Sequence, residues 1–371
     1  MINVRRVLAV TLLVVGIPFA ARAAGASSRT SRFPSPDWPV ARDLRAAGTS
    51  QERVHAFDAW LRNHGGRSWA AVVIMDGYLV YEGHGARCYV RMKNDCGSID
   101  KAVYSTVLGV ALYQKKLSSL DEKAMRYWKD PFVTPYAKDR SITFRQFAMF
   151  KGDWDQPTLT GTFFDNNGGA TAAAACVAGL FTHVSGPRPQ GMAQVARKEV
   201  AEKIGADWTL WYWAADFLPK PGDSGPQMVL DSSVYELAKL GYLWLNRGRW
   251  KNARIFGVDY YKEATTDWSP NTGSRAYKHF CHMGFWWYVN DHQVLLPGVP
   301  ADAFYAIGNG EPKRATCLLV IPSFDAVAVL SMSRLSDDGK WDVIKNGEGP
   351  SNDGPRLFAA QVARLRVVSS R

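Results

Sequence analysis

The sequence contains few cysteines, no internal repeat and, beyond its amino-terminal end, no long apolar run. Five cysteines in 371 residues exclude a small scaffold that disulfides hold together. The absence of a repeat of about 20 to 50 residues argues against a solenoid or a propeller. Fourteen tryptophans and nineteen prolines argue against a coiled coil. Because 47% of the residues are hydrophobic, the chain is expected to fold as one large domain or two.

The first 23 residues have the pattern of a cleaved export signal. Two arginines precede the apolar run Val7–Ala20, and Ala21-Arg22-Ala23 fits a cleavage site with small residues around one variable position. The run is shorter than the roughly 20 apolar residues that a membrane-spanning helix needs. Residues 1–23 are therefore predicted to be a signal peptide and residues 24–49 an amino-terminal tail. The mature protein is expected in the periplasm or outside the cell, without a stable membrane span.

The charge balance indicates a solvated basic surface. The whole chain carries a formal charge of +11, and removing the three arginines of residues 1–23 leaves 42 basic against 34 acidic residues, or +8. The basic residues are dispersed without a run of five, so nucleic acid is not an expected partner. The spacing of cysteines and histidines matches no zinc pattern, and neither a metal nor an organic cofactor is expected.

Strand patterns occur near both ends of the chain. Trp69–Met75 and Tyr78–Glu82 are joined by Asp76-Gly77, a dipeptide typical of a tight hairpin. Further strands are expected at residues 284–289, 315–321 and 326–332. We therefore predict an α/β (α+β) fold with an antiparallel sheet that is flanked by helices from both chain ends. Residues 50–120 and 231–371 would form this sheet domain.

Helical periodicity accounts for most of the remaining chain. In the sheet domain, helices are expected at residues 50–63, 98–114, 234–246 and 355–365. Residues 121–230 are predicted to be an inserted all-helical region, with helices at residues 144–150, 170–180 and 190–204. Ser233 and Glu236 are expected to form a capping box for the helix at 234–246.

The spacing of the cysteines leaves their pairing open. Cys88 and Cys96 could close a short loop, and Cys281 and Cys317 flank expected neighbouring strands. Buried free thiols, including Cys176, explain the same residues equally well.

One motif suggests nucleophilic chemistry. Ser98-Ile99-Asp100-Lys101 opens an expected amphipathic helix, so the serine would lie at the positive end of the helix dipole and Lys101 one turn further on. A lysine with a lowered pKa can take the serine proton, and amides at the helix start can hold an oxyanion. The alternative is a helix-capping serine beside a solvated lysine. Asp100 could pair with Lys101 or with an arginine, or be a favourable first-turn acid.

The order of the segments around this motif resembles the serine β-lactamase and penicillin-binding-protein superfamily. The likeness is greatest to its esterase and amidase branch, the class C β-lactamase-like serine hydrolases. It covers about residues 50–365 and rests on the following segments: Asp76–Glu82, Ser98–Lys101, Ile142–Phe147, Tyr235–Arg249, Gly284–Trp287 and Tyr305–Gly310.

The resemblance implies a role for each matched position. Ser98 would be the acylated nucleophile and Lys101 its general base or proton relay. The backbone N–H groups of Ser98 and of Asn309, which follows Gly308, would form the oxyanion hole. The substrate would be a small ester or amide, and the oligomeric state is left open.

Two departures from the family pattern concern its second and third motifs. The second motif normally supplies a tyrosine that assists proton transfer. Here it falls on residues 164–169, where Asp165 replaces the tyrosine if Asn167 takes the asparagine position, and Phe164 replaces it if Asn166 does. The third motif, Ala306-Ile307-Gly308, lacks the cation that binds substrate carboxylates, which argues against β-lactamase or carboxypeptidase activity.

Aromatic side chains could line an acyl pocket or belong to the core. The pocket interpretation selects Trp213, Trp286 and Tyr305, together with Asn167. Two functions therefore remain open. The first is an exported serine hydrolase that acts through an acyl-enzyme, and the alternative is a catalytically degenerate β-lactamase-like protein with a binding or regulatory role.

Overall fold

The computed structural model describes residues 32–127, 137–151, 168–181, 188–213, 227–268, 282–310, 314–333 and 353–367. These residues lie within one compact unit, Ser31–Arg371. None of their helices is both long and apolar enough to cross a bilayer.

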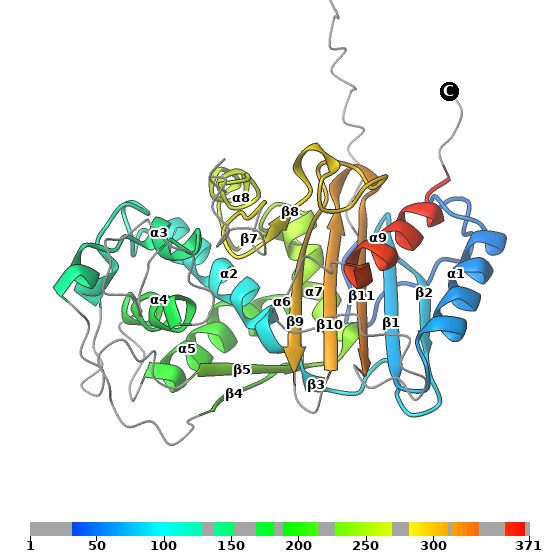
Figure 1. Ribbon diagram of the computed structural model, residues 1–371, viewed down its shortest axis with the longest axis horizontal. Coiled ribbons are helices and arrows are strands. Elements are labelled where there is room, and N and C mark those ends of the chain that lie inside the picture. The colour runs from blue at the N-terminus through cyan, green and yellow to red at the C-terminus, as the bar shows by residue number, and fades with distance from the viewer. Residues whose placement is uncertain are drawn as a thin grey trace, which may run out of the picture. The chain divides into compact units, whose positions relative to one another are not determined.

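A six-stranded antiparallel sheet forms the centre of the fold and draws on both ends of the chain (Figure 1). Its strands run in the order β2-β1-β11-β10-β9-β8. Their bounds are β1 Trp69–Met75, β2 Tyr78–His84, β8 Tyr288–Val289, β9 Phe304–Gly310, β10 Arg314–Ile321 and β11 Ala326–Ser333. Strand β1 pairs with β11 over its whole length, from Trp69 opposite Met332 to Met75 opposite Ala326. The predicted antiparallel sheet built from the two chain ends is thereby confirmed.

The predicted hairpin between β1 and β2 has the expected turn. Asp76 and Gly77 both have positive φ values, 49° and 77°, which match the right-handed twist of the two strands. All seven residues of β1 are buried because the strand is covered on both faces, and its sequence is accordingly one continuous apolar run.

Helices cover both faces of the sheet (Figure 1). On one face, α1 (Gln51–His64) and α9 (Asp353–Leu365) pack on side chains such as Val73 and Leu319. On the other face, α7 (Val234–Leu245) packs on side chains such as Val72 and Leu318. Helix α2 (Asp100–Tyr113) belongs to this second core, and the 3₁₀ turn η1 (Gly97–Ile99) that precedes it contacts β9.

The region that was predicted to be all-helical also contains strands, so this detail of the prediction is wrong. Its helices are α3 Phe144–Ala148, α4 Gly168–Gly179, α5 Arg188–Ala196 and α6 Glu202–Ile204, with a π-helical turn at Arg197–Ala201 and 3₁₀ turns at Ala124–Tyr127 and Ala137–Ser141. A second sheet joins β4 (Thr209–Trp213) and β5 (Gln227–Ser232) to the short β3 (Asn94–Asp95). The aromatic run in β4 has a high strand propensity, which explains the difference. The proposed domain boundaries stay predictions.

The remaining elements follow α7. They are the two-stranded β6 (Arg249–Trp250) and β7 (Ala253–Arg254), α8 Val258–Ala264, and the 3₁₀ turns Asp291–Gln293 and Pro322–Phe324.

Two further local predictions are only partly correct. The strand expected at residues 284–289 is restricted to β8, because Trp286 has φ +60°, which no strand residue adopts. At the start of α7, the Ser233 hydroxyl accepts from Glu236 N as predicted. The Glu236 carboxylate does not complete the capping box, because it accepts instead from the Asp207 amide and the Lys239 ammonium.

Candidate active site

Ser98 lies in the 3₁₀ turn η1 rather than at the capping position of α2. Ile99 is the N-cap of α2, and no side chain caps this helix. The turn is fixed by Gly97, whose φ is +54° and whose N–H donates to Asp95 Oδ1 at 2.7 Å. Ser98 itself is partly exposed. The interpretation of Ser98 as a helix-capping serine is therefore wrong, and its hydroxyl is available for other contacts.

Lys101 lies one helical turn after Ser98 and is almost completely buried, with 4% of its surface exposed. Its amino group donates to Ser98 Oγ at 2.9 Å. The alternative of a solvated lysine is therefore also wrong. Fixing a lysine side chain costs about 2 kcal/mol of rotamer entropy, so the surrounding packing must offset this loss to hold Lys101 against Ser98.

Glycines allow β9 to approach the Ser98 turn closely. A Cβ on Gly308 would clash with the Cys96 carbonyl oxygen and lie 2.8 Å from Ser98 N. From the other side, a Cβ on Gly97 would lie 2.5 Å from Asn309 N. No side chain fits at either position, so the backbone of Asn309 lies directly against that of the turn.

The N–H of Asn309 points away from β10, towards the edge of the sheet. On that side the Ala303 carbonyl accepts from Asn290 N, next to the short β8. The register of β9 with β10 is unbroken. Backbone N–H and C=O groups alternate in direction from one strand residue to the next. The amides of residues 305, 307 and 309 therefore point to the same side of β9 as the Ala303 carbonyl. Strand β8 pairs only with residues 304 and 305. The Asn309 N–H therefore lies on the edge that η1 occupies, as an oxyanion hole with Ser98 N requires.

Asp100 completes a line of contacts through the first turn of α2. It is 1% exposed, and its Oδ1 is 3.8 Å from Lys101 Nζ. Its Oδ2 accepts from the Tyr104 hydroxyl at 2.8 Å. Burial, together with the charge of Asp100, raises the pKa of Tyr104 well above its usual value, so this hydroxyl keeps its proton.

Comparisons with known proteins identify the fold. No family model matches the chain. The class C β-lactamase of Rhodobacter sphaeroides superposes with a TM-score of 0.56 at 14% identity, over 85% of this chain and 99% of that one. A candidate 6-aminohexanoate-dimer hydrolase of Bacillus anthracis gives 0.58 at 16% identity, over 90% and 89% of the two chains. A penicillin-binding-protein homologue of Pyrococcus abyssi gives 0.54 at 14% identity, over 85% and 76%. The chain has the serine β-lactamase fold.

A curated relative adds sequence similarity without a described activity. It is an uncharacterised protein of Alkalihalophilus pseudofirmus, 27% identical over 158 residues, which are 38% of this chain. The chain spans about 45% of the length of this relative.

The segment Ala306-Ile307-Gly308, to which the resemblance assigns the third motif, lies on β9 beside the Ser98 turn. Its first residue, Ala306, is 3% exposed and belongs to the same core as α2. The second motif, residues 164–167 with Asp165 and Asn167, lies outside the described residues. The second motif of the family is usually Tyr-x-Asn, a pattern that Tyr288-Val289-Asn290 also matches. This segment has a structural role, because the buried Asn290 Nδ2 donates to the carbonyls of Leu296, Val299 and Pro300.

Two of the aromatic residues considered for an acyl pocket belong to the core instead. Trp286 is 3% exposed and packs edge-on against Tyr104 and Phe150. Tyr305 is fully buried and stacks on Tyr288, in the core under α1 and α9 on the opposite face of the sheet from Ser98. Neighbouring strand residues alternate between the two faces, so Tyr305 cannot share a face with Ala306. The side chain of Trp213 lies outside the described residues.

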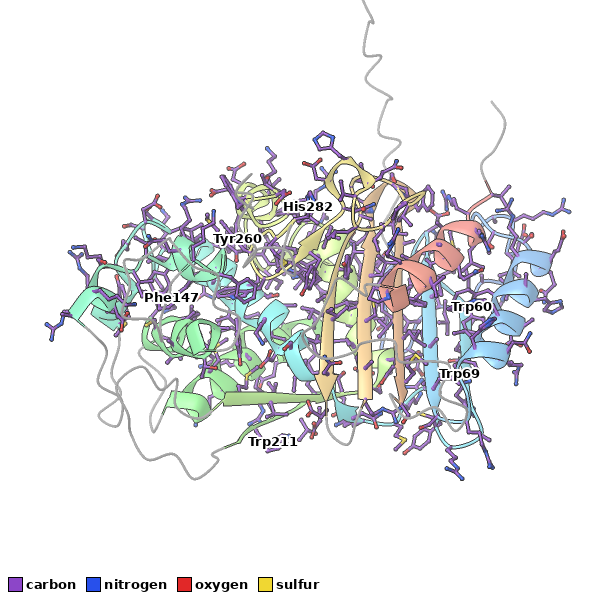
Figure 2. The ribbon with its side chains drawn as sticks, viewed as in Figure 1. Trp60, Trp69, Phe147, Trp211, Tyr260 and His282 are labelled. Atoms are coloured by element: carbon purple, nitrogen blue, oxygen red, sulfur yellow. The ribbon has the colours of Figure 1, made fainter. Side chains whose placement is uncertain are left out.

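Acidic residues, which sequence analysis did not select, adjoin the site. Asp95 of β3 lies opposite Asp231 of β5, just before the Ser98 turn. Burial raises the pKa of Asp231, and Asp95 adds to this effect, whereas the Trp211 indole opposes it by donating to Asp231 at 2.8 Å. Trp211 is 40% exposed on β4 (Figure 2). Only the pairing of β3 with β5 reveals this neighbourhood, because 135 positions separate the two carboxylates in the sequence.

The cysteines and histidines described here form neither a disulfide nor a metal site. Cys88, Cys96, Cys176 and Cys317 are free and buried, so the possible Cys88–Cys96 pair does not form, and Cys281 lies outside the described residues. Among these residues, no three of His, Cys, Asp and Glu gather as metal ligands. His282 pairs with Asp267 at 2.6 Å (Figure 2).

Proposed function

We propose that the protein is a serine hydrolase that cleaves a small ester or amide through an acyl-enzyme on Ser98. The observation that carries this proposal is the 2.9 Å contact between the buried Lys101 amino group and the partly exposed Ser98 hydroxyl. The backbone of Asn309, which lies against the turn that carries Ser98, supports the same conclusion. The names of the structural neighbours, which include a class C β-lactamase and a 6-aminohexanoate-dimer hydrolase, agree with this kind of reaction.

The reaction follows from these groups. The Lys101 amino group takes the proton of Ser98 while Oγ attacks the substrate carbonyl. The oxyanion that forms is held by the N–H groups of Ser98 and Asn309. The Lys101 ammonium then returns its proton to the leaving alcohol or amine as that bond breaks. In the second half of the cycle, water attacks the acyl-enzyme while Lys101 takes its proton, the bond between the acyl carbon and Ser98 Oγ breaks, the acid leaves, and Lys101 returns the proton to Oγ.

The third motif restricts the substrate class. Ala306 provides no charge at the position where related enzymes hold a substrate carboxylate. We therefore expect neutral esters and amides to be cleaved in preference to β-lactams. A chromogenic cephalosporin should be turned over at least about 100-fold less efficiently than a p-nitrophenyl ester of a short acid. Equal efficiency with the two substrates would contradict this choice.

The decisive experiment is active-site labelling with a fluorophosphonate, followed by mass spectrometry of the modified peptide. The wild type should carry one phosphonyl group on Ser98 and should hydrolyse p-nitrophenyl esters. Ser98→Ala should lose both properties. Ser323→Ala, which changes an exposed serine of the turn Pro322–Phe324, is the matched control and should keep both. An unlabelled wild type, or ester turnover that Ser98→Ala leaves unchanged, would favour the catalytically degenerate binding or regulatory protein.

Export is part of the proposal and rests on residues 1–23 of the sequence. The full-length chain, expressed in a Gram-negative host, should be found in the periplasm with Ala24 as its first residue. The same chain without residues 1–23 should stay in the cytoplasm. Equal distribution of the two forms would contradict the predicted signal peptide.

A further inference from the structure

Asp100 and Lys101 are two oppositely charged side chains that are buried together at the start of α2. Asp100 is 1% exposed and Lys101 is 4% exposed. Lys101 Nζ is 2.9 Å from Ser98 Oγ on one side and 3.8 Å from Asp100 Oδ1 on the other. Nucleophile, amine and carboxylate thus follow one another within a single helical turn.

Burial makes the charge on Lys101 expensive at the moment when the reaction creates it. When Lys101 takes the Ser98 proton, an ammonium forms where almost no water can solvate it. A carboxylate at 3.8 Å offsets this cost, because Coulomb attraction between partners this close is strong where the dielectric constant is low. Within the part of the chain that the structure describes, Asp100 is the ion-pair partner of Lys101, so without it the proton transfer would create a buried charge that lacks this compensation.

The carboxylate is held in place from its other side. The Tyr104 hydroxyl donates to Asp100 Oδ2 at 2.8 Å, and it lies 3.4 Å from the Met228 carbonyl of β5. Tyr104 follows Asp100 by four residues, so the two side chains share one face of α2. Because Tyr104 is itself 1% exposed, its ring has little freedom to move away.

We propose that Asp100 is a positioning residue for Lys101, and that Ser98, Lys101 and Asp100 act together as a Ser–Lys–Asp triad. This inference rests on the proposed function. Asp100 corresponds to the buried aspartate of a Ser–His–Asp triad, which orients the base and stabilises its protonated form without itself taking the proton.

The test compares Asp100→Asn with the wild type in two measurements on the intact protein. These are the rate constant of Ser98 phosphonylation and the steady-state hydrolysis of a p-nitrophenyl ester. Asparagine keeps the size of the side chain and can still accept from Tyr104, but it removes the charge. We expect both kcat and the phosphonylation rate to fall by about 100-fold or more, with KM within about threefold of wild type. Asp100→Glu, which keeps the charge, should recover part of the lost rate.

Glu199→Gln is the matched control, because it neutralises another buried carboxylate, one that contacts Lys203 and Gln114. This variant should leave both rates unchanged. A rate for Asp100→Asn within about threefold of wild type, or equal losses in Asp100→Asn and Glu199→Gln, would overturn the triad. Phosphonylation of wild-type Ser98 in the same experiment would show that the proposed function survives that result. An unlabelled wild type would overturn both.

Tyr104→Phe provides a second route if Asp100→Asn does not fold. It keeps the charge of Asp100 and removes only the hydroxyl that holds Oδ2. We expect the phosphonylation rate to fall by about five- to tenfold, because Asp100 would lose the contact that fixes its orientation. An unchanged rate in a folded Tyr104→Phe protein would contradict the positioning role.

Discussion

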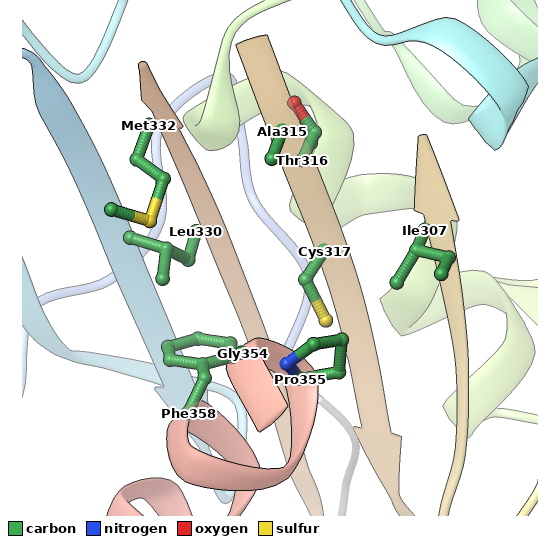
Figure 3. A pocket seen from close by; sticks show the side chains of 9 residues that line it. All are labelled: Ile307, Ala315, Thr316, Cys317, Leu330, Met332, Gly354, Pro355 and Phe358. Carbon is green, nitrogen blue, oxygen red and sulfur yellow. The ribbon is translucent and has the colours of Figure 1, made fainter. Parts of the chain in front are cut away.

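The two faces of the six-stranded sheet differ in what they bury. Under α1 and α9, the core side chains are apolar, and a small pocket of about 20 Å³ remains between the sheet and the start of α9 (Figure 3). Phe358 and Cys317 line this pocket. Under α2 and α7, the described core also contains the buried charges of Asp100, Lys101 and Lys239. Buried charges are costly to keep, so under the proposed function we expect the first face to serve stability and the second to carry the chemistry.

The sharpest test of the stability assignment is Phe358→Ala on α9. The side chain is fully buried against the sheet, and its removal enlarges a pocket that already exists. We expect the free energy of unfolding to fall by about 3–5 kcal/mol in urea denaturation, with the phosphonylation rate per folded molecule unchanged. Leu357→Ala, whose side chain is 48% exposed on the same helix, should cost less than about 0.5 kcal/mol. A large loss of the labelling rate in Phe358→Ala would contradict the division between the two faces.

On the other face, Gly308→Ala should affect the reaction strongly. The new methyl group would clash with the Cys96 carbonyl and push β9 away from Ser98 N. We expect kcat to fall by about 100-fold, as expected when one oxyanion donor is displaced, and stability by about 1–3 kcal/mol. Gly257→Ala is the control, because a methyl group there would meet no atom within 4 Å. Ester hydrolysis and urea denaturation measure the two effects, and unchanged kcat in Gly308→Ala would argue against this oxyanion hole.

The α2 side should also contribute pH-dependent stability, through Glu122 in the loop after the helix. The Ser118 hydroxyl, the Tyr127 hydroxyl and the amides of Ser118 and Ser119 lower the pKa of Glu122 from 4.5 to about 2. Because the pKa is lower in the folded state, this contribution is present above pH 4.5 and is lost as the pH falls towards 2. Glu122→Gln should therefore destabilise the protein at pH 7 and flatten its stability between pH 5 and pH 2. Urea denaturation across this range measures the effect. If the stability of Glu122→Gln falls with pH as steeply as that of wild type, the assignment is wrong.

The smallest expected effect is in thiol labelling on the α9 side. Burial raises the pKa of Cys317 to about 12, so almost no thiolate exists at pH 8. Cys281 lies outside the described residues and is replaced by serine so that it does not take part in the labelling. In this Cys281→Ser protein, we expect Cys317 to react with a thiol reagent only after the protein is unfolded. Peptide mass spectrometry after a short exposure of the folded protein checks this. Rapid modification of Cys317 would show that the pocket beside α9 opens readily.

Local sequence patterns were sufficient for the elements that local rules dominate. Asp76-Gly77 predicted its hairpin because few dipeptides tolerate two positive φ values, and apolar periodicity predicted α2 and α9. Prediction failed where distant contacts decide. The aromatic run of β4 was not expected to be a strand, and the strand at residues 284–289 was expected to be longer, because Trp286 adopts a positive φ within a packed core.

For the candidate site, the sequence by itself determined which groups stand next to one another on one helical turn: Ser98, Asp100 and Lys101. It could not decide between a capping serine with a solvated lysine and a nucleophile with a buried base, because both have the same letters. Tertiary structure decided only the surroundings of these groups: it buries Lys101 and brings β9, more than 200 residues away, against the Ser98 turn. The physical reason is that burial and backbone approach depend on what packs around a residue, which no local pattern contains.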